Sequence, residues 1–484
     1  MYNMEQQDDC GNKIRNQIFC RYQHDYKQQH EGACQTQKPG SQQQQQQQQH
    51  QQPQQQQQQQ QQSERATTIC IAIYLMSEVC LMMDVDKSTT AQQIVSMIQS
   101  DGELGLTRTP PCTSNQPVFA LWLCSSQLEL QLRPSHRPLD LATKWPRLVN
   151  KYSTQQSSSS NGVNSTIRDT SDEEPLLYFR RNVFLSRRDE EQIKEPKILE
   201  LLYAEAKRNV LDGRYPCESQ ARYTSLGALQ ARIELGPYNV QTHTLAFFRK
   251  HRRHFLPHHY NTPSLLLGLG LGGKGSPEAR LLEQYKRIPN HTTGPNANPR
   301  KLVRKYLEFC WGLPCYGAAF FHGQIERPVR GLASWIMNRD VPVLVAINTI
   351  GVYIVDDTQC SLLLGLRYSE LNWGMLKPSD ETNPDCLPCL ILQFPVRENG
   401  ARVIKILQVF SRQAIMMDTL ITGFVEESKQ NEAADENVNA NNRLQDNSML
   451  SNFGSFTNKL SKFTLATFDE EGHCIGQMGS WSIQ

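Results

Sequence analysis

The sequence lacks any apolar run long enough to cross a lipid bilayer. A spanning helix needs roughly 20 mostly apolar residues, whereas the best candidate, LLLGLGLGG at residues 265–273, is short and interrupted by glycine. No apolar signal segment opens the chain. We therefore expect a cytoplasmic protein whose contact with membranes is peripheral.

An excess of charge of one sign is also missing. The chain has 50 Lys+Arg against 48 Asp+Glu, which leaves a formal net charge of +2 over 484 residues. A nearly neutral chain has no general attraction for nucleic acid or for an anionic membrane. We expect no nucleic-acid partner, and any electrostatic binding must come from a local patch of charge.

The 14 cysteines do not form a recognisable framework, because they are scattered among apolar segments. A reduced setting with buried or spare thiols fits this pattern better than a disulfide-rich fold. Cys386 and Cys389 have the spacing of half a zinc site or of a redox pair, but no second pair lies at a zinc-like distance. Cys310 and Cys315 do not complete the site. We expect no metal, and redox or metal use is the less favoured alternative.

Other catalytic patterns are also missing. GLGLGGKG at residues 268–275 lacks the spacing of a phosphate-binding loop, and no serine lies in a nucleophile-elbow context. The sequence also has no persuasive carboxylate cluster. We therefore expect a chain that is not an enzyme, has no cofactor and takes no small-molecule substrate.

Polar low-complexity stretches divide the chain. Residues 1–66 contain a glutamine tract with almost nothing apolar to bury, so we expect a disordered arm. Residues 153–174 are expected to be a polar linker or insertion. The tail, residues 430–484, is expected to be mostly disordered, although the spaced aromatic residues of FGSFTNKLSKFTLATF suggest a short docking segment.

The first organised block, residues 67–152, has the pattern of a small sheet. Alternating apolar residues over 69–75 and 79–85 predict a hairpin. Thr90 and Gln93 predict a capping box at the start of an amphipathic helix. The runs VFALWLC and LELQL predict further strands, and RPLDLATKWPRLVNKY closes the block. This order is typical of a ubiquitin-like sheet.

The second block, residues 175–314, has helical periodicity. An apolar stripe begins after residue 195 and stops at Asp212-Gly213, and Asn298 with Pro299 predicts the start of a last helix. Between them, residues 221–235 form a helix that has small or apolar residues on most of its circumference. Its clearest polar side consists of Gln220, Tyr223, Gln230 and Glu234. Arg222 and Arg232 are expected to reach water at the edges, and the helix is expected at the centre of the helical lobe.

The third block, residues 315–429, returns to strand periodicity. The runs VPVLVAI, GVYIVDD, SLLLGLRYSELNWGM, CLILQFPV and RVIKILQVF are followed by a helix that Ser411 caps. Short strands closed by one helix predict a pleckstrin-homology-like sandwich.

The order of the three blocks resembles the FERM domain, and the local text is similar as well. YAEAKRNVLDGRYPCESQARYTSLGALQARIELGPYN, LVRKYLEFCWGLPCYGAAFF and VLVAINTIGVYIV are similar to segments of the helical and third lobes of that family. The resemblance implies an α+β chain with a three-lobed cloverleaf. Its lobes would be a ubiquitin-like β-grasp, an acyl-CoA-binding-protein-like helical bundle and a PH/PTB-like sandwich, with disordered tails at both ends.

Within the family, GLRYSELNWGM and LQVFSRQAIMMDTLITGFVEES most resemble the Bili-type adaptors. This resemblance implies a non-enzymatic adaptor at the inner face of the plasma membrane, which binds cytoplasmic tails of transmembrane proteins. The tails would be those of rhomboid pseudoproteases in sheddase complexes or of Wnt co-receptors, with negative regulation of Wnt signalling as one outcome. The glutamine tract and the insertions SSSSNG and PSLLLGLGLGGKGSP depart from the common pattern.

Two binding surfaces are predicted. The first is a peptide groove between a strand edge and the last helix, with Leu366, Arg367, Tyr368, Ser369, Leu371, Trp373 and Ile421 as its candidate residues, together with Glu370 and Asn372 in the strand. Half of these side chains would be core in any strand, which is the plain alternative.

The second surface is the basic run RKHRRHFLPHH at residues 249–259. Arg249, Lys250, Arg252 and Arg253 could contact acidic lipid headgroups or an acidic partner, and the neighbouring histidines would add charge at lower pH. A solvated helix end is the plain alternative. If the patch is used, the chain would be a phosphoinositide-directed linker between membrane and cytoskeleton.

Overall fold

The computed structural model describes the three organised blocks and part of the tail. The described residues are 68–102, 104–106, 116–153, 174–261, 276–288, 299–327, 340–383, 386–398, 401–435, 463–469 and 473–478. The glutamine-rich arm, the SSSSNG insertion, residues 263–275 of the second insertion and the expected helix cap at residue 298 lie outside them. No helix in these ranges is both long and apolar enough to cross a membrane.

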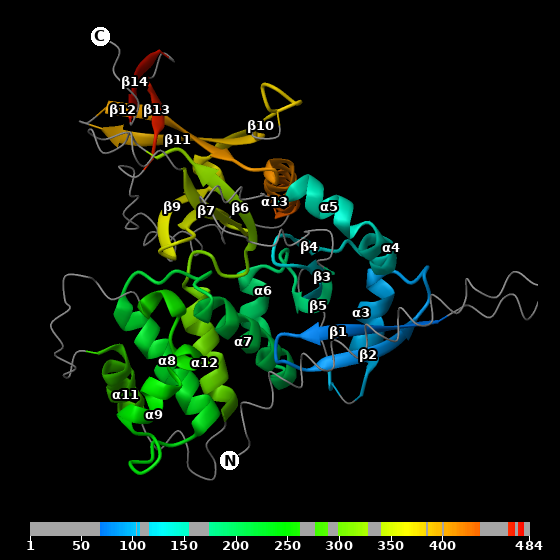
Figure 1. The fold of residues 1–484 in the computed structure, drawn as a ribbon, viewed down its shortest axis with the longest axis vertical. Coiled ribbons are helices and arrows are strands. Elements are labelled where there is room, and N and C mark those ends of the chain that lie inside the picture. Colours follow the sequence, from blue (N-terminus) through cyan, green and yellow to red (C-terminus); the bar gives the residue numbers. More distant parts are fainter. Residues whose placement is uncertain are drawn as a thin grey trace, which may run out of the picture. The chain divides into compact units, whose positions relative to one another are not determined.

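The first lobe is a five-stranded sheet with the order β2-β1-β5-β3-β4 (Figure 1). Its strands are β1 (Ile69–Leu75), β2 (Cys80–Val85), β3 (Phe119–Cys124), β4 (Glu129–Gln131) and β5 (Leu176–Arg181). The predicted hairpin is confirmed, with Ile73 opposite Leu81 in the antiparallel pair. The helices are α3 (Ala91–Ser100), α4 (Pro138–Thr143) and α5 (Trp145–Tyr152). The capping box is also present, because Thr90 and Gln93 satisfy each other's backbone N–H groups at the start of α3.

Strand β5 corrects the predicted boundary at residue 175. We assigned this segment to the helical block, but β5 lies inside the first sheet, parallel to β1 and antiparallel to β3. The prediction failed because Arg180 and Arg181 make the strand look exposed. Both are buried, and their guanidinium groups pair with Glu129, Glu205 and Glu190.

The second lobe is helical, as expected. It consists of α6 (Arg187–Gln192), α7 (Pro196–Leu211), α8 (Gln220–Leu235), α9 (Leu245–Lys250), α10 (Arg252–Phe255), η2 (His258–Asn261), α11 (Pro277–Arg287) and α12 (Pro299–Trp311). Helix α8 packs against α11, α12 and α10, so the prediction that it lies at the centre of the lobe is confirmed. Helix α8 approaches α10 closely at Gly227, where an added Cβ would lie 2.4 Å from the carbonyl oxygen of Phe255.

The predicted polar side of α8 is wrong at two of its positions. Tyr223 and Gln230 are only 5% and 1% exposed. The Tyr223 hydroxyl accepts a hydrogen bond from the N–H of Cys217, and the Gln230 amide donates to the carbonyl of His254. Arg232, which we expected at an edge, is 1% exposed and donates to the carbonyl of Gly236. These three polar side chains bind backbone groups of neighbouring segments. They therefore do not mark a face of α8 that is in contact with water.

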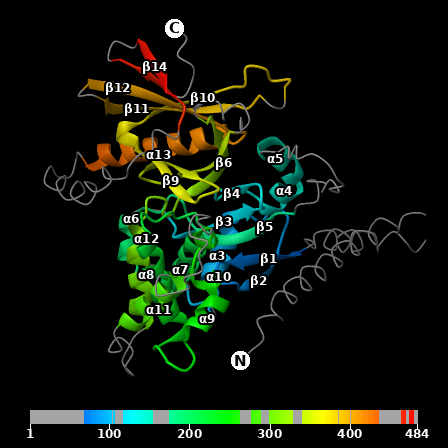
Figure 2. The same cartoon turned by 60° about the vertical axis from the view of Figure 1, so that its left-hand side comes forward.

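The third lobe contains a sheet path in the order β10-β11-β12-β6-β7-β8-β9. The strands are β6 (Ala319–Ile325), β7 (Val341–Ile347), β8 (Gly351–Asp356), β9 (Ser361–Arg367), β10 (Asn372–Leu376), β11 (Cys389–Glu398) and β12 (Ala401–Phe410). The short helix η6 (Tyr368–Glu370) separates β9 from β10. Helix α13 (Ala414–Asp435) packs on the sheet (Figure 2) and buries Ala414, Met417, Ile421 and Phe424, whose spacing follows the helical period.

Part of the tail also belongs to the third lobe, and it includes the C-terminal end of the expected short docking segment. Strands β13 (Leu465–Phe468) and β14 (Cys474–Met478) form a hairpin, and β13 extends the sheet beside β12. Phe463 and Leu465 are fully buried in the core of this lobe. The spaced aromatic residues in the sequence were therefore a correct signal of docking.

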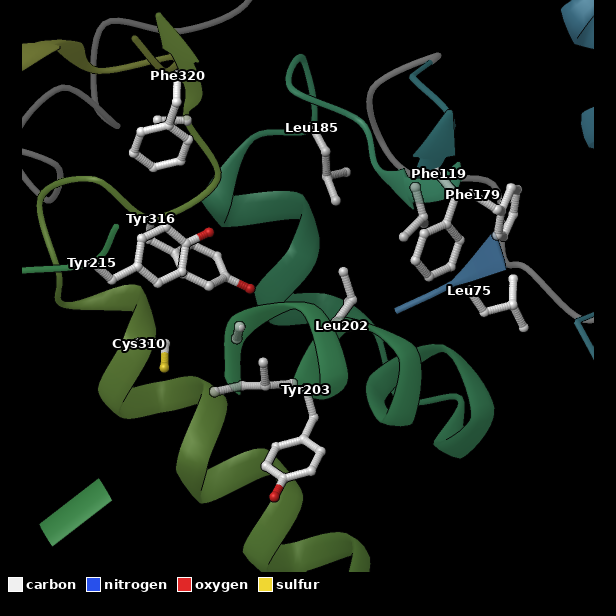
Figure 3. Packing of buried hydrophobic residues seen from close by; sticks show 14 of the residues in the cluster. Leu75, Phe119, Phe179, Leu185, Leu202, Tyr203, Tyr215, Cys310, Tyr316 and Phe320 are labelled. Atoms are coloured by element: carbon white, nitrogen blue, oxygen red, sulfur yellow. The ribbon is translucent and has the colours of Figure 1, made fainter. Parts of the chain in front are cut away.

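One hydrophobic cluster runs through all three lobes. It includes Phe179 of β5, Leu202 of α7 and Phe320 of β6 (Figure 3). Between the lobes, the rings of Tyr215 and Tyr316 lie 5.5 Å apart. The lobes therefore share buried surface through this cluster.

Glu190 is the polar centre of this junction and is completely buried. Its carboxylate accepts hydrogen bonds from Arg181 Nε at 2.7 Å and Trp311 Nε1 at 2.9 Å, and also from the Tyr316 hydroxyl. Gly317 has a φ of +66°, and a Cβ there would lie 2.5 Å from Arg181. The glycine of the LPCYG segment is thus required both by the turn and by the arginine beside it.

Candidate functional site

The clearest candidate for peptide binding in the third lobe is the edge formed by β10. Among the described strands, β10 pairs only with β11, over Asn372–Leu376. A strand alternates its N–H and C=O groups between its two sides, so the outer side of β10 presents backbone groups without a strand partner. Helix α13 packs against β10 and β11 and forms a wall beside this edge.

The structure divides the predicted groove residues into two groups. Leu366, Leu371 and Ile421 are core side chains, with at most 4% of their surface exposed. Leu366 lies opposite Val352 in the β8–β9 ladder, so it faces no groove. We treated residues 366–373 as one strand, but η6 interrupts it and turns the chain from one end of the sheet path to the other.

The remaining predicted residues lie nearer to the surface. Arg367, Tyr368 and Trp373 are partly exposed, and Ser369 is exposed. The Tyr368 hydroxyl donates to the carbonyl of Asn348, which fixes η6 against the β7–β8 turn. Of the predicted residues, Asn372 and Trp373 lie on β10 itself. Met375 shares the apolar face of Trp373, and the 51% exposed Leu376 lies on the opposite face of the strand. The alternation of NWGML could have indicated Leu376 from the sequence.

Helix α13 has a second apolar face that sequence reasoning missed. A cavity of about 1150 Å³ separates this face from the first lobe. Its lining includes Ile415, Met416, Leu420 and Gly423 of α13, with Val95 and Leu130 of the first lobe. The signal was present in the sequence, because apolar residues occupy two sides of α13 at helical spacing.

Hydrogen bonds also join α13 and the residues before it to the first lobe. Gln413 donates to the carbonyl of Gln127, and Arg412 donates to the carbonyl of Asn150. Gln116 and Glu427 both line the cavity, and the Gln116 amide donates to the Glu427 carboxylate at 3.2 Å. The same helix therefore borders the sheet core, the β10 edge and the cavity.

The basic patch is smaller than predicted. Arg249, Lys250 and Arg253 are exposed on α9 and α10. Arg252, however, pairs with the buried carboxylate of Glu278 at 2.9 Å and is therefore structural. Burial, followed by the neighbouring His258, lowers the pKa of His259 to about 4, so this histidine adds no charge at mildly acidic pH.

The two cysteines of CLPC have different environments. Cys389 is buried in β11, and burial raises its pKa to about 11. Cys386 lies outside the strand, where the hydrogen bond to Ser379 lowers its pKa. Within the described residues, no group of three or more histidine, cysteine or acidic side chains is placed to hold a metal ion.

Comparisons with known proteins match the second and third lobes. The model described as FERM central domain matches residues 188–321, and the model described as KRIT1/FRMD8, FERM domain C-lobe, matches residues 341–420. The FERM domain-containing protein 8 of Xenopus tropicalis is 34% identical over 390 residues, which cover 79% of this chain and 80% of the relative. The chain belongs to the FERM family. Edge strand β10 lies within its matched C-lobe.

A human relative and a solved structure are also similar to this chain. The human FERM domain-containing protein 8 is 38% identical over 323 residues, and the match covers 66% of this chain and 66% of that protein, just under two thirds of its length. A solved structure of the human myosin 7b C-terminal MyTH4-FERM domain in complex with the harmonin-a PDZ3 domain is 17% identical. It has a TM-score of 0.47 and covers 75% of this chain and 60% of that chain.

Proposed function

We propose that this FERM protein is a non-enzymatic cytoplasmic adaptor that binds cytoplasmic tails of transmembrane proteins at the inner face of the plasma membrane. The tails are those of rhomboid pseudoproteases in sheddase complexes or of Wnt co-receptors, and occupancy stabilises the bound receptor or lowers Wnt signalling. The observation that carries the proposal is the open edge of β10 beside α13.

The mechanism is strand addition. An extended tail segment pairs its backbone with the outer side of β10, and those hydrogen bonds supply affinity that depends little on sequence. Specificity comes from side chains that meet Trp373, Met375 and Leu376, which offer apolar surface at this edge. No covalent bond is made or broken, and the chain acts by holding its partner.

Binding of tail peptides to the full chain tests this proposal. Leu376→Asp places a charge at the β10 edge, and Ile415→Asp places one in the cavity between the lobes. Val240→Asp is the matched control, because Val240 is a 72% exposed apolar residue of the second lobe. We expect Leu376→Asp to weaken binding at least fivefold and the other two variants to bind like the unmodified chain.

Other outcomes would contradict the proposal in different ways. If the unmodified chain retains neither class of tail, the proposed partners are wrong. If Ile415→Asp alone abolishes retention, the tail binds in the cavity and the β10 edge is not the site. Thermal unfolding of each variant must be compared first, so that loss of folding is not mistaken for loss of binding.

A second candidate function is binding of phosphoinositide membranes by Arg249, Lys250 and Arg253, whose charges lie together at the surface of α9 and α10. The triple substitution of these residues by glutamine should leave the fold intact, because Arg252 keeps its pair with Glu278. Sedimentation with liposomes that contain phosphoinositide separates the functions. Loss of liposome binding together with full retention of tail peptides would assign the patch to lipid.

A further inference from the structure

The C-terminal hairpin occupies one edge of β12. Strand β13 pairs with β12 at Ile404, Lys405 and Ile406, whereas β6 reaches β12 only at Phe410 (Figure 1). Strand β14 pairs only with β13 among the described strands. This edge differs from the β10 edge, which lies at the end of the sheet path.

The contacts of the hairpin follow a simple alternating pattern. Phe463 and Leu465 are fully buried, and Thr467, the next residue in this row, is 6% exposed. Opposite Thr467 lies Lys405, which is 2% exposed and stands in the inward row of β12 between Val403 and Leu407. The Lys405 ammonium donates a hydrogen bond to the Thr467 hydroxyl at 2.8 Å.

Lys405 keeps a charged partner when the hairpin leaves. Lys405 Nζ also lies 2.8 Å from the carboxylate of Glu398, at the end of β11. A buried ammonium that lost every partner would be costly, but Glu398 remains when β13 departs. Among strands β6–β12, only β12 pairs with the hairpin, through β13, so the other described strand pairs remain when the hairpin departs.

We propose that the β12 edge at residues 403–407 is a strand-exchange site. It binds either the chain's own hairpin or an extended peptide that presents an aromatic, an aliphatic and a hydroxyl or carboxylate side chain at alternate positions. The row of Phe463, Leu465 and Thr467 is the internal copy of this ligand. A carboxylate at the third position would pair with Lys405 through opposite charge, which the hydroxyl of Thr467 does not provide.

The hairpin has an advantage over an external peptide because it belongs to the same chain as the β12 edge. Residues 436–462 join α13 to the hairpin, and a tethered ligand competes at an effective concentration of up to about millimolar. An external peptide therefore gains access only if it binds more tightly than the hairpin or if the hairpin is weakened.

The test measures binding of a fluorescent peptide with the sequence of residues 461–469 to the full chain. Leu465→Ser weakens the internal hairpin, and Thr464→Ser, at the next position on the opposite side of the strand, is the matched control. We expect the peptide to bind Leu465→Ser at least tenfold more tightly than it binds either the unmodified chain or Thr464→Ser. Absence of binding to Leu465→Ser, with its fold intact, would overturn the proposal.

A second peptide tests the role of Lys405. The same peptide with Thr467→Glu should bind the Leu465→Ser chain at least fivefold more tightly than the original peptide. Adding Lys405→Met to that chain should remove the difference. Equal binding of both peptides while Lys405 is present would show that the lysine does not select the ligand.

Hydrogen exchange of the unmodified chain covers the case in which Leu465→Ser fails to fold. We expect the amides of residues 465–468 to exchange at least tenfold faster than the most protected amides of β11 and β12, because exchange through release of the hairpin does not require global unfolding. Equal protection would mean that the hairpin is a permanent part of the sheet and would overturn the proposal.

Discussion

At the scale of single residues, two helical glycines have opposite surroundings. Gly227 of α8 is in close contact, since an added Cβ would lie 2.4 Å from the Phe255 carbonyl oxygen and 2.8 Å from Leu281 Cδ1. Gly423 of α13 has no atom within 4 Å of the same position. The first glycine is required by packing, and the second leaves room in the cavity between the lobes.

These surroundings predict opposite effects of the same substitution. Gly227→Ala should lower the free energy of unfolding by about 2 kcal/mol or more, because the backbone of residue 255 must move. Gly423→Ala should raise it by about 0.5–1 kcal/mol, because alanine is the better helix former and fits without strain. Urea unfolding of both variants checks the pair. Equal effects would contradict the close approach at Gly227.

At the scale of helices and strands, most of the fold could be predicted from periodicity. The β1–β2 hairpin, the capped helix α3 and the buried stripe of α13 follow from the order of apolar and polar residues. Strand β5 could not be predicted in this way, because Arg180 is buried through Glu129 and Glu205, which are distant in the sequence, and Arg181 through Glu190 of the following helix. The β10 edge was misplaced because the turn at η6 carries no glycine or proline to mark it.

Three helices of the second lobe meet at Glu234. Its carboxylate on α8 lies 2.6 Å from His254 Nε2 on α10 and 3.0 Å from Lys207 Nζ on α7. Burial alone would raise the pKa of Glu234, but the hydrogen bond with His254 and the charge of Lys207 outweigh burial and lower this pKa to about 2. The carboxylate therefore stabilises the fold only while it is ionised.

The resulting pH dependence has a defined sign. Because the folded pKa is below the unfolded value of 4.5, the stabilisation is complete above that value and is lost as the pH falls toward 2. We expect Glu234→Gln to cost at most about 3 kcal/mol near pH 7 and to flatten the decline in stability between pH 5 and pH 2.5. Urea unfolding across this range measures the effect.

A neighbouring residue supplies the control. Glu200 on α7 is 48% exposed and pairs with Lys197 at the surface. We expect Glu200→Gln to keep the pH slope of the unmodified chain, because exposed pairs contribute little to stability. If Glu234→Gln also keeps that slope, the cluster of three helices does not hold the carboxylate as described.

At the scale of the whole molecule, Glu190 joins the lobes through one carboxylate. Its partners are Arg181 of the first sheet, Trp311 at the end of α12 and Tyr316 just before β6. The sequence gives no sign of this role, because RRDEEQ resembles an exposed helical turn. Such a site becomes visible only when segments that are distant in sequence come together.

Removing this carboxylate should affect all three lobes at once. Glu190→Ala leaves the buried guanidinium of Arg181 without its counter-charge, which typically costs about 3–5 kcal/mol. We expect a large fall in the midpoint of a single thermal transition, measured by calorimetry. Glu191→Ala is the matched control, since its carboxylate is 39% exposed and pairs with Arg187 at the surface, and should cost less than about 1 kcal/mol. Comparable losses in both variants would contradict the role of Glu190.

Helix α13 borders both the β10 edge and the cavity against the first lobe. A ligand that binds on one side and prefers a slightly displaced helix changes the width of the space on the other. Thermodynamic linkage then requires the two ligands to alter each other's affinity by the same factor. Displacement of α13 would in this way couple the affinity of the β10 edge for one partner to the affinity of the cavity for another.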